Sequence, residues 1–209
     1  MTLARPSRPH LILASGSRTR RDMLKAAGVF FSVQTADVDE VAMRDALAAE
    51  HGDDIVPPED VAEILACAKA EAVSAAHPDA LVIGADQVLE LEGEIFAKPA
   101  DMEAAREQLL RLRGRAHKLH SAVAIAKAGD TLWAHLDTAE LAMRDFSPRF
   151  LDDYLAAAGD KVATSVGAYQ IEGLGVQLFE RVDGGHFTIL GMPLLPLLTE
   201  LRRIGAVAT

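Results

Sequence analysis

Residues 10–27 read HLILASGSRTRRDMLKAA, and this stretch decides how the fold begins. The apolar run at residues 10–14 predicts a buried strand, and residues 18–27 carry apolar side chains at helical spacing. The turn Ser15-Gly16-Ser17 joins the two, and Gly28 suits the C-terminal end of the helix. A buried strand that turns directly into a helix is typical of an α/β domain.

The same alternation of strands and helices continues along the chain. The further strands expected are residues 29–33, 80–85, 88–91, 94–97, 118–127, 131–143, 176–181 and 187–190. The further helices expected are residues 41–51, 57–76, 101–112, 148–158 and 193–204. This order predicts the α/β class, with an elongated mixed sheet flanked by helices. We expect one domain over residues 1–209, with room for two lobes around one central sheet.

The composition is that of a globular chain from a reducing compartment. The chain has 209 residues, half of them hydrophobic, a net charge of −10, and one cysteine, Cys67, which allows no internal disulfide. A chain this negative repels polyanions, so we expect no nucleic acid polymer as a partner. No apolar run approaches the roughly 20 residues needed to cross a bilayer, so we expect a cytoplasmic protein that does not bind a membrane.

The turn after the first strand has the chemistry of an anion site. A helix N-terminus presents free N–H groups, and Ser15 and Ser17 can add hydroxyl donors. Arg18, Arg20 and Arg21 oppose the helix dipole, so they are a poor choice for stability but a good one for phosphate. The alternative is a solvated basic turn in which Ser17 caps the helix.

Acidic residues follow two of the expected strands. Asp86 is expected to end a buried strand, where ligands of α/β sheets bind, and residues 37–40 (DVDE) follow another. Carboxylates in such places can hold Mg²⁺ or activate water. Lys98, after the hairpin, could reach a phosphate. The alternatives are a turn capped by Asp86, a surface lysine, and a helix N-cap with acidic residues in its first turn.

Residues 167–175 read GAYQIEGLG. Glycines at this density indicate positive φ angles or a close approach of backbone to another group. Tyr169, Gln170 and Glu172 could read the edge of a base. The alternative is an ordinary tight loop.

Taken together, these motifs resemble the Maf family of nucleotide pyrophosphatases. The stretch LILASGSRTRRDML at residues 11–24 is similar to the family's opening motif, LILAS-x-SPRR-x-ELL. The further motifs, in the family's order, are DVDE (37–40), AKA (68–70), GADQ (84–87), AKP (97–99), GAYQIEGLG (167–175) and GMP (191–193). Agreement of several separated motifs in order is far more specific than any one of them.

The resemblance implies a fold similar to that of inosine triphosphate pyrophosphatases, often as a homodimer. It implies a housecleaning enzyme that cleaves a nucleoside triphosphate between the α and β phosphates, giving a nucleoside monophosphate and pyrophosphate. It also implies a divalent metal such as Mg²⁺, Mn²⁺ or Co²⁺, which would orient the attacking water and lower its pKa.

Roles carry over to this chain by matching motif. The catalytic residues implied are Asp86, Glu40 and Lys98, with Asp86 and Glu40 also as metal ligands. The substrate-binding residues implied are Ser15, Ser17, Arg20, Arg21, Lys69, Gln87 and Glu172. The basic groups among them would neutralise charge that develops on the pyrophosphate leaving group.

The chain departs from the family pattern at one arginine. Arg18-Thr19-Arg20 stands where the family has Pro-Arg-Arg, so the first family arginine is missing, and Arg20-Arg21 matches members with one other residue before the pair. Gln87 and Glu172 resemble the 7-methyl-GTP branch, where the dTTP/UTP branch has Thr and Gln.

The branch positions favour a modified or guanine-type nucleotide such as 7-methyl-GTP. An ionised Glu172 only accepts hydrogen bonds, and a guanine edge offers more N–H donors than a thymine edge. Three alternatives stay open: a pyrophosphatase that prefers dTTP or UTP, a non-hydrolysing nucleotide-binding regulator of cell division, and a metal-dependent phosphatase of sugar phosphates. Thr19, where the family arginine is missing, is the residue that most favours the regulator.

Overall fold

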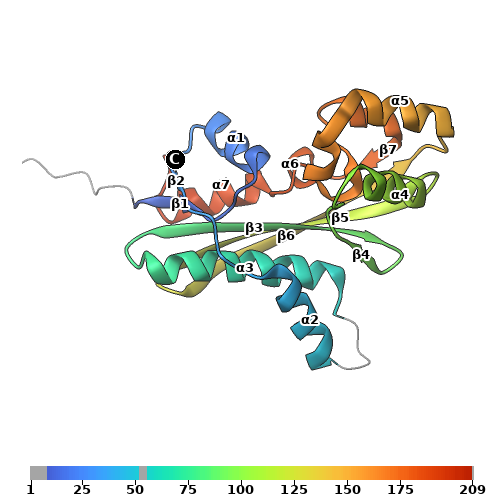
Figure 1. Cartoon of the computed structure of the whole chain (residues 1–209). Coiled ribbons are helices and arrows are strands. Elements are labelled where there is room, and N and C mark those ends of the chain that lie inside the picture. The colour runs from blue at the N-terminus through green and yellow to red at the C-terminus, as the bar shows by residue number, and fades with distance from the viewer. Residues whose placement is uncertain (1–8, 52–55, 209) are drawn as a thin grey trace, which may run out of the picture.

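A mixed β-sheet runs the length of the molecule, with helices on both faces (Figure 1). The structure is a computed structural model that describes residues 9–51 and 56–208. The strands are β1 (Leu11–Leu13), β2 (Ser32–Val33), β3 (Leu81–Leu91), β4 (Glu94–Phe96), β5 (Ala116–Lys127), β6 (Asp130–Met143) and β7 (Phe179–Asp183). The helices are α1 (Arg18–Ala26), α2 (Glu40–His51), α3 (Pro58–Ala76), α4 (Met102–Leu112), α5 (Pro148–Ala158), α6 (His186–Ile189) and α7 (Leu194–Arg203). Short 3₁₀ helices lie at Gly159–Thr164, Val166–Ala168 and Leu174–Leu178.

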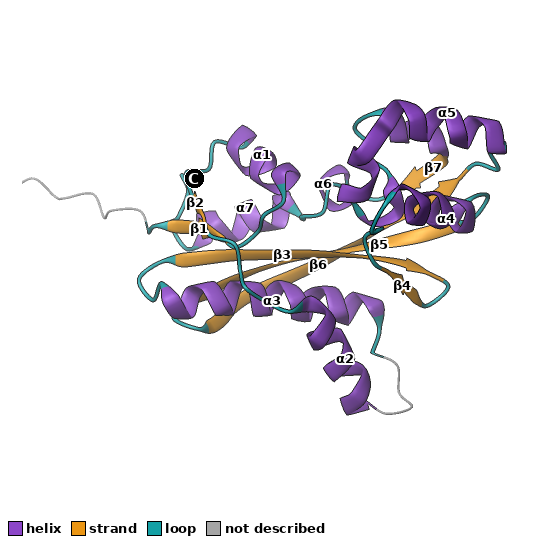
Figure 2. Cartoon of the chain, viewed as in Figure 1, coloured by secondary structure: helices purple, strands orange, loops and turns teal. Residues whose placement is uncertain are grey.

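The seven strands lie in the order β2-β1-β3-β5-β6-β7, with β4 paired to β3. The pair β1–β3 is parallel and the pairs β3–β5 and β5–β6 are antiparallel, so the sheet is mixed as predicted. In Figure 2, α3 covers one face, while α1 and α7 at one end and α4 and α5 at the other cover the opposite face. The α/β class with a helix-flanked mixed sheet is therefore confirmed. Among the described helices, none combines the length and the apolar character that crossing a bilayer requires.

Three apolar clusters fill the space between these layers. One lies between α3 and the sheet, and includes Leu65, Val82 and Val88. A second lies under α1 and α7, and a third under α4 and α5. Both faces of β3 and of the second half of β5 are buried, which explains the apolar runs at residues 81–85 and 122–126.

The strand β3 is longer than the sequence predicted. A strand at residues 80–85 with a separate segment at 88–91 was expected, but β3 is continuous and pairs with β5 from Val82 to Glu90. The two polar residues Asp86 and Gln87 interrupt the apolar pattern, so the sequence alone indicates that the strand ends there. In the fold the two side chains point to opposite faces, and each finds hydrogen-bond partners there, so the ladder is not interrupted.

The interruption lies instead on one edge of β3. The parallel strand β1 pairs only with residues 81–83, and the antiparallel strand β4 pairs only with residues 89–91. Within the described residues, positions 84–88 therefore have a strand partner on the β5 side alone. The prediction that Asp86 ends a strand was wrong for β3, but Asp86 does lie just past the carboxyl end of β1.

Three other expectations need correction. Residues 187–190 form no strand: α6 starts after Gly185 and ends before Gly191, and its carbonyl groups are bound by side chains of the sheet. Residues 174–178 form a 3₁₀ helix, and the strand β7 begins only at Phe179. The strand expected at residues 29–33 is reduced to Ser32–Val33, since β1, its partner, is itself only three residues long.

Candidate active site

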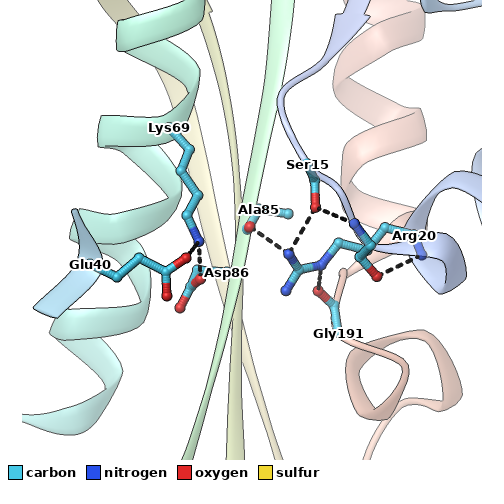
Figure 3. Close-up of polar contacts among 8 residues, drawn as sticks. Ser15, Arg20, Glu40, Lys69, Ala85, Asp86 and Gly191 are labelled. Atoms are coloured by element: carbon cyan, nitrogen blue, oxygen red, sulfur yellow. Dashed lines mark hydrogen bonds and ion pairs between the residues drawn. The ribbon is translucent and has the colours of Figure 1, made fainter. Parts of the chain in front are cut away.

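The free edge of β3 brings together side chains from distant parts of the sequence. Figure 3 shows two polar groups, one on either side of the strand. Lys69 and Glu40 lie with Asp86 on one side, and Ser15, Arg20 and Gly191 lie on the other. We name them the carboxylate cluster (Glu40, Lys69, Asp86) and the guanidinium cluster (Ser15, Arg20, Ala85, Gly191).

The carboxylate cluster is centred on an ammonium group. Lys69 Nζ lies 2.5 Å from Asp86 Oδ1 and 2.7 Å from Glu40 Oε1. The side chains of Lys69 and Asp86 are only 11% and 6% exposed, whereas that of Glu40 is 44% exposed. Two carboxylates share one ammonium, so the cluster keeps a net negative charge.

A glycine lets α3 come close enough to make this cluster. A Cβ on Gly84 would lie 2.2 Å from the carbonyl oxygen of Ala66 and 2.7 Å from the nitrogen of Ala70. Only a residue without a side chain fits there, so α3 lies directly against β3. Lys69, next to Ala70 on this helix, is thereby brought within reach of Asp86.

One oxygen of the cluster is left without a partner. Asp86 Oδ2 is buried and has no hydrogen bond within the described residues. A buried carboxylate oxygen without a donor is costly, and a cation would satisfy it. The described residues contain no group of three or more His, Cys, Asp or Glu side chains that could hold a metal. The donor set therefore fits an ion such as Mg²⁺ that takes one or two protein carboxylates and completes its shell with substrate phosphates and water.

The guanidinium cluster holds Arg20 in one orientation. Arg20 Nε donates to the carbonyl of Gly191 at 2.8 Å, and Nη1 donates to the carbonyl of Ala85 at 2.7 Å and to Ser15 Oγ at 3.2 Å. The Ala85 carbonyl belongs to the free edge of β3. The donors on Nη2 make no bond to the described residues, so they remain available for a ligand.

Burial lowers the pKa of the Arg20 guanidinium from its ordinary value, and the charges of Asp86 and Glu40 raise it in part. An arginine stays protonated in proteins even so. Arg20 is thus a fixed positive charge that is attracted electrostatically by both carboxylates of the carboxylate cluster, on the other side of β3.

The turn before α1 forms the helix cap that the sequence allowed as an alternative. Ser17 is the N-cap of α1, and its hydroxyl accepts from the nitrogen of Arg20 at 3.4 Å. Ser15 is buried and its Oγ accepts from the nitrogen of Ser17 at 3.3 Å. Arg21 Nε is buried with no hydrogen-bond partner among the described residues. Arg18, in contrast, is 86% exposed and pairs with Asp22.

The acidic segment before α2 divides in a similar way. Asp39 Oδ1 accepts from the nitrogen of Ala42 at 3.0 Å, in the manner of a helix cap. Asp37 and Asp39 are exposed, and it is Glu40, the first residue of α2, that reaches Lys69.

The amide of Gln87 is turned toward α6. Its Nε2 donates to Ser121 Oγ at 3.0 Å and to the carbonyls of Thr188 and Ile189, both at 3.1 Å. Both amide protons are therefore used within the protein, and Oε1 is the part of this side chain left to contact a ligand.

Three predicted positions lie apart from the two clusters. Lys98 is exposed in the segment between β4 and α4, and Glu172 is exposed in the glycine-punctuated segment. Neither makes a hydrogen bond or ion pair with the part of the chain that the structure describes. Tyr169 is buried, with its hydroxyl 2.7 Å from His117 Nε2, so it supports this segment and is not free to read a base.

Sequence reasoning missed Ser121 and the packing role of Gly84. Ser121 is fully buried in β5, and its hydroxyl donates to the carbonyl of Thr188 at 2.7 Å. The signal was present: Ser121 directly precedes the apolar run at residues 122–126 of the strand, and buried polar groups need partners. For Gly84, the signal was a glycine within an apolar strand, which marks close backbone approach.

A guanidinium held by three oxygens and a pair of carboxylates that share one ammonium thus lie on opposite sides of one free strand edge in a mixed α/β sheet. The family model described as Maf-like protein matches residues 10–204. The chain therefore belongs to the Maf-like protein family.

Relatives at about half identity span almost the whole chain. A protein of Brucella abortus biovar 1 (strain 9-941), named 7-methyl-GTP pyrophosphatase, is 54% identical over 92% of this chain and 95% of its own length. A protein of Paramagnetospirillum magneticum (strain ATCC 700264 / AMB-1), named nucleoside triphosphate pyrophosphatase, is 54% identical over 93% of this chain and 98% of its own length.

A solved structure also overlaps with this fold. It is a nucleoside-triphosphatase, dITP/XTP pyrophosphatase, from Mycobacterium abscessus, with a TM-score of 0.41 and 14% identity over 92% of this chain and 93% of its own. An overlap of that size does not assign the fold.

Proposed function

We propose that this protein hydrolyses nucleoside triphosphates between the α and β phosphates, releasing a nucleoside monophosphate and pyrophosphate. One observation carries the proposal: Arg20 and Asp86 lie on opposite sides of the same free strand edge. Among the described residues, Arg20 Nη2 has no acceptor and the buried Asp86 Oδ2 has no donor. Membership of the Maf-like family and the names of the relatives support it.

The guanidinium cluster is the proposed triphosphate site. Arg20 and Arg21, in the first turn of α1, and Ser15 and Ser17, in the turn before it, supply the donors of this site. A helix N-terminus adds free N–H groups to this site. Because Arg20 is already held by three protein oxygens, it needs little reorganisation when charge develops on the leaving pyrophosphate. Lys98 is assigned to the same phosphates.

The carboxylate cluster is the proposed site of water activation. Glu40 and Asp86 would hold a divalent cation such as Mg²⁺, Mn²⁺ or Co²⁺, which supplies a Lewis acid that lowers the pKa of the attacking water. The carboxylate of Asp86 takes the proton of that water, and the water oxygen bonds to the α phosphorus. The bond from the α phosphorus to the bridging oxygen breaks, and its electron pair leaves with pyrophosphate. Lys69 fixes both carboxylates and offsets their mutual repulsion.

For the base, we propose a modified or guanine-type nucleotide such as 7-methyl-GTP. Oε1 of Gln87 and the carboxylate of Glu172 are both acceptors, which suits the N–H donors of a guanine edge. An exposed Glu172 has no protein partner among the described residues that would compete for it.

The test is a hydrolysis panel on the full-length protein. Canonical and methylated nucleoside triphosphates are incubated with Mg²⁺, Mn²⁺ or Co²⁺, and the products are separated by chromatography. We expect monophosphate and pyrophosphate, with 7-methyl-GTP turned over faster than dTTP or UTP. Release of orthophosphate would replace the proposed reaction with that of a phosphatase, and a preference for dTTP or UTP would overturn the base assignment alone.

The role of Asp86 is tested by Asp86→Asn in the same panel. An amide cannot take the proton of water, so kcat should fall by about a thousandfold or more with the fold intact. Near-normal turnover would remove Asp86 from the mechanism. As a control, Asp79→Asn changes an exposed acidic residue in the turn before β3 and should leave kcat unchanged.

A second candidate function is a nucleotide-binding regulator that does not turn over. Thr19, at the position of the missing family arginine, and the exposed Arg18 favour it. Tight binding of a triphosphate without any product would select it over hydrolysis.

The main proposal also includes a cytoplasmic location, a homodimer and a housecleaning role. Sedimentation of the purified protein tests the homodimer.

A further inference from the structure

We infer that Ser121 and Gln87 are positioning residues that hold Arg20 in place through α6. The inference rests on the proposed function, because it assigns to Arg20 the binding of the triphosphate. Neither side chain needs to touch the phosphates for this role.

The link starts at the carbonyl of Thr188. This oxygen accepts three donors: Ser121 Oγ at 2.7 Å, Gln87 Nε2 at 3.1 Å and the nitrogen of Gly191 at 2.9 Å. Gln87 Nε2 also donates to Ile189 O and to Ser121 Oγ, so the two side chains form one clamp on the end of α6.

The clamp fixes the turn that follows α6. Gly191 has a φ of +95°, and a Cβ there would lie 3.4 Å from Gln87 Oε1 and 3.5 Å from Arg20 Nε. The turn is therefore pressed against both side chains, and a residue with a side chain would be strained in it. The carbonyl of Gly191 then points at Arg20 Nε, 2.8 Å away.

Arg20 is consequently oriented from two independent directions. The edge of β3 binds Nη1 through Ala85, and the turn after α6 binds Nε through Gly191. Removing the clamp should let the turn move and Arg20 with it, while the Ala85 contact remains. A misplacement of a phosphate-binding group by about 1 Å is enough to cost activity.

A short helix also needs this clamp for its own stability. α6 has only four residues, and the last carbonyls of a helix have no partner within it. Buried hydroxyl and amide donors from the sheet satisfy these carbonyls, which explains why a serine is fully buried in β5.

The first variant is Ser121→Ala, assayed with 7-methyl-GTP and with dTTP. Loss of one buried hydrogen bond should lower kcat/KM about five- to tenfold for both nucleotides, since Arg20 binds phosphate and not base. Ser74→Ala is the matched control. Ser74 is also fully buried, bonds to main-chain groups of Glu71 and Gly129 near the C-terminal end of α3, and belongs to neither cluster. It should leave kcat/KM within about twofold.

The decisive measurement is the effect of Ser121→Ala on kcat/KM in a protein that lacks the Arg20 side chain. In an Arg20→Ala background, Ser121→Ala should lower kcat/KM no further, because the positioned group is gone. A loss of equal size in both backgrounds, or no loss in either, would overturn the inference. Gln87→Met is a second test of the clamp. Equal losses of kcat/KM for both nucleotides would support positioning. A changed preference between the nucleotides, with the effect of Arg20→Ala on kcat/KM unaltered, would make Gln87 a base contact only.

Binding of inorganic tripolyphosphate separates this inference from the proposed reaction. Calorimetry should show weaker binding by Ser121→Ala when Arg20 is present, and no difference when it is absent. If no nucleoside triphosphate is hydrolysed but this pattern holds, the reaction falls and the positioning role stands. Tripolyphosphate affinity that does not depend on Arg20 would overturn the positioning role.

Discussion

Replacing Lys69 with methionine isolates the ion pairs that join α2, α3 and β3. Methionine keeps most of the length and apolar surface of the lysine but removes its charge. The change leaves Asp86 buried without Lys69, whereas Glu40 is already 44% exposed to solvent. We expect the free energy of unfolding to fall, mostly because of Asp86.

The magnitude follows from the geometry. At separations of 2.5 and 2.7 Å and an effective dielectric constant near 20, the Coulomb attraction of each pair is about 6–7 kcal/mol before desolvation is counted. Desolvation of Lys69 and Asp86 offsets much of this, and the exposed Glu40 contributes little. Removing one partner of a buried pair costs about 3–5 kcal/mol, which corresponds to a drop in Tm of about 10 °C for a chain of this size.

The assay is thermal and guanidinium unfolding of the wild type, Lys69→Met and the double variant Lys69→Met/Asp86→Asn. The double variant should recover most of the lost stability, because no charge is left buried alone. Lys127→Met, at an exposed lysine, should stay within about 0.5 kcal/mol of the wild type. A Lys69→Met protein as stable as the wild type, or a double variant that recovers nothing, would refute the reasoning.

Three further predictions follow from single contacts. Gly84→Ala should lower the free energy of unfolding by about 2–3 kcal/mol or more in guanidinium unfolding, because its Cβ would lie 2.2 Å from the Ala66 carbonyl oxygen; an unchanged midpoint would contradict the packing. Burial lowers the pKa of His117 from 6.5 to about 4. The free energy of unfolding should therefore fall by about 3 kcal/mol as the pH drops from about 6.5 to about 4, because only the unfolded chain takes up the proton in that range. His117→Phe should flatten this part of the curve of stability against pH. Chelation with EDTA should abolish hydrolysis while Tm stays within about 2 °C, since Lys69 already neutralises part of the carboxylate charge; a large drop in Tm would indicate a structural metal instead.

The sequence by itself determined the fold class and most of the elements. The strand–turn–helix at residues 10–27, the long hairpin of β5 and β6, and the helices α3, α4, α5 and α7 are set by local periodicity and caps, which act over a few residues. The same local signals offered Ser17 as an N-cap and a capped helix start after the acidic segment, which the structure shows at Asp39. The order of motifs along the chain was enough to suggest the family.

Only the tertiary structure decided how these residues meet. Whether Asp86 ends a strand depends on where β1 stops and β4 starts, and α6 forms in place of a strand because Ser121 and Gln87 bind its carbonyls. Lys69 reaches Asp86 only because Gly84 admits α3, and Arg20 is held by Gly191 from 171 residues away in sequence. Periodicity acts within a turn or a pleat, whereas these contacts depend on close packing between segments far apart in the chain, which no local pattern encodes.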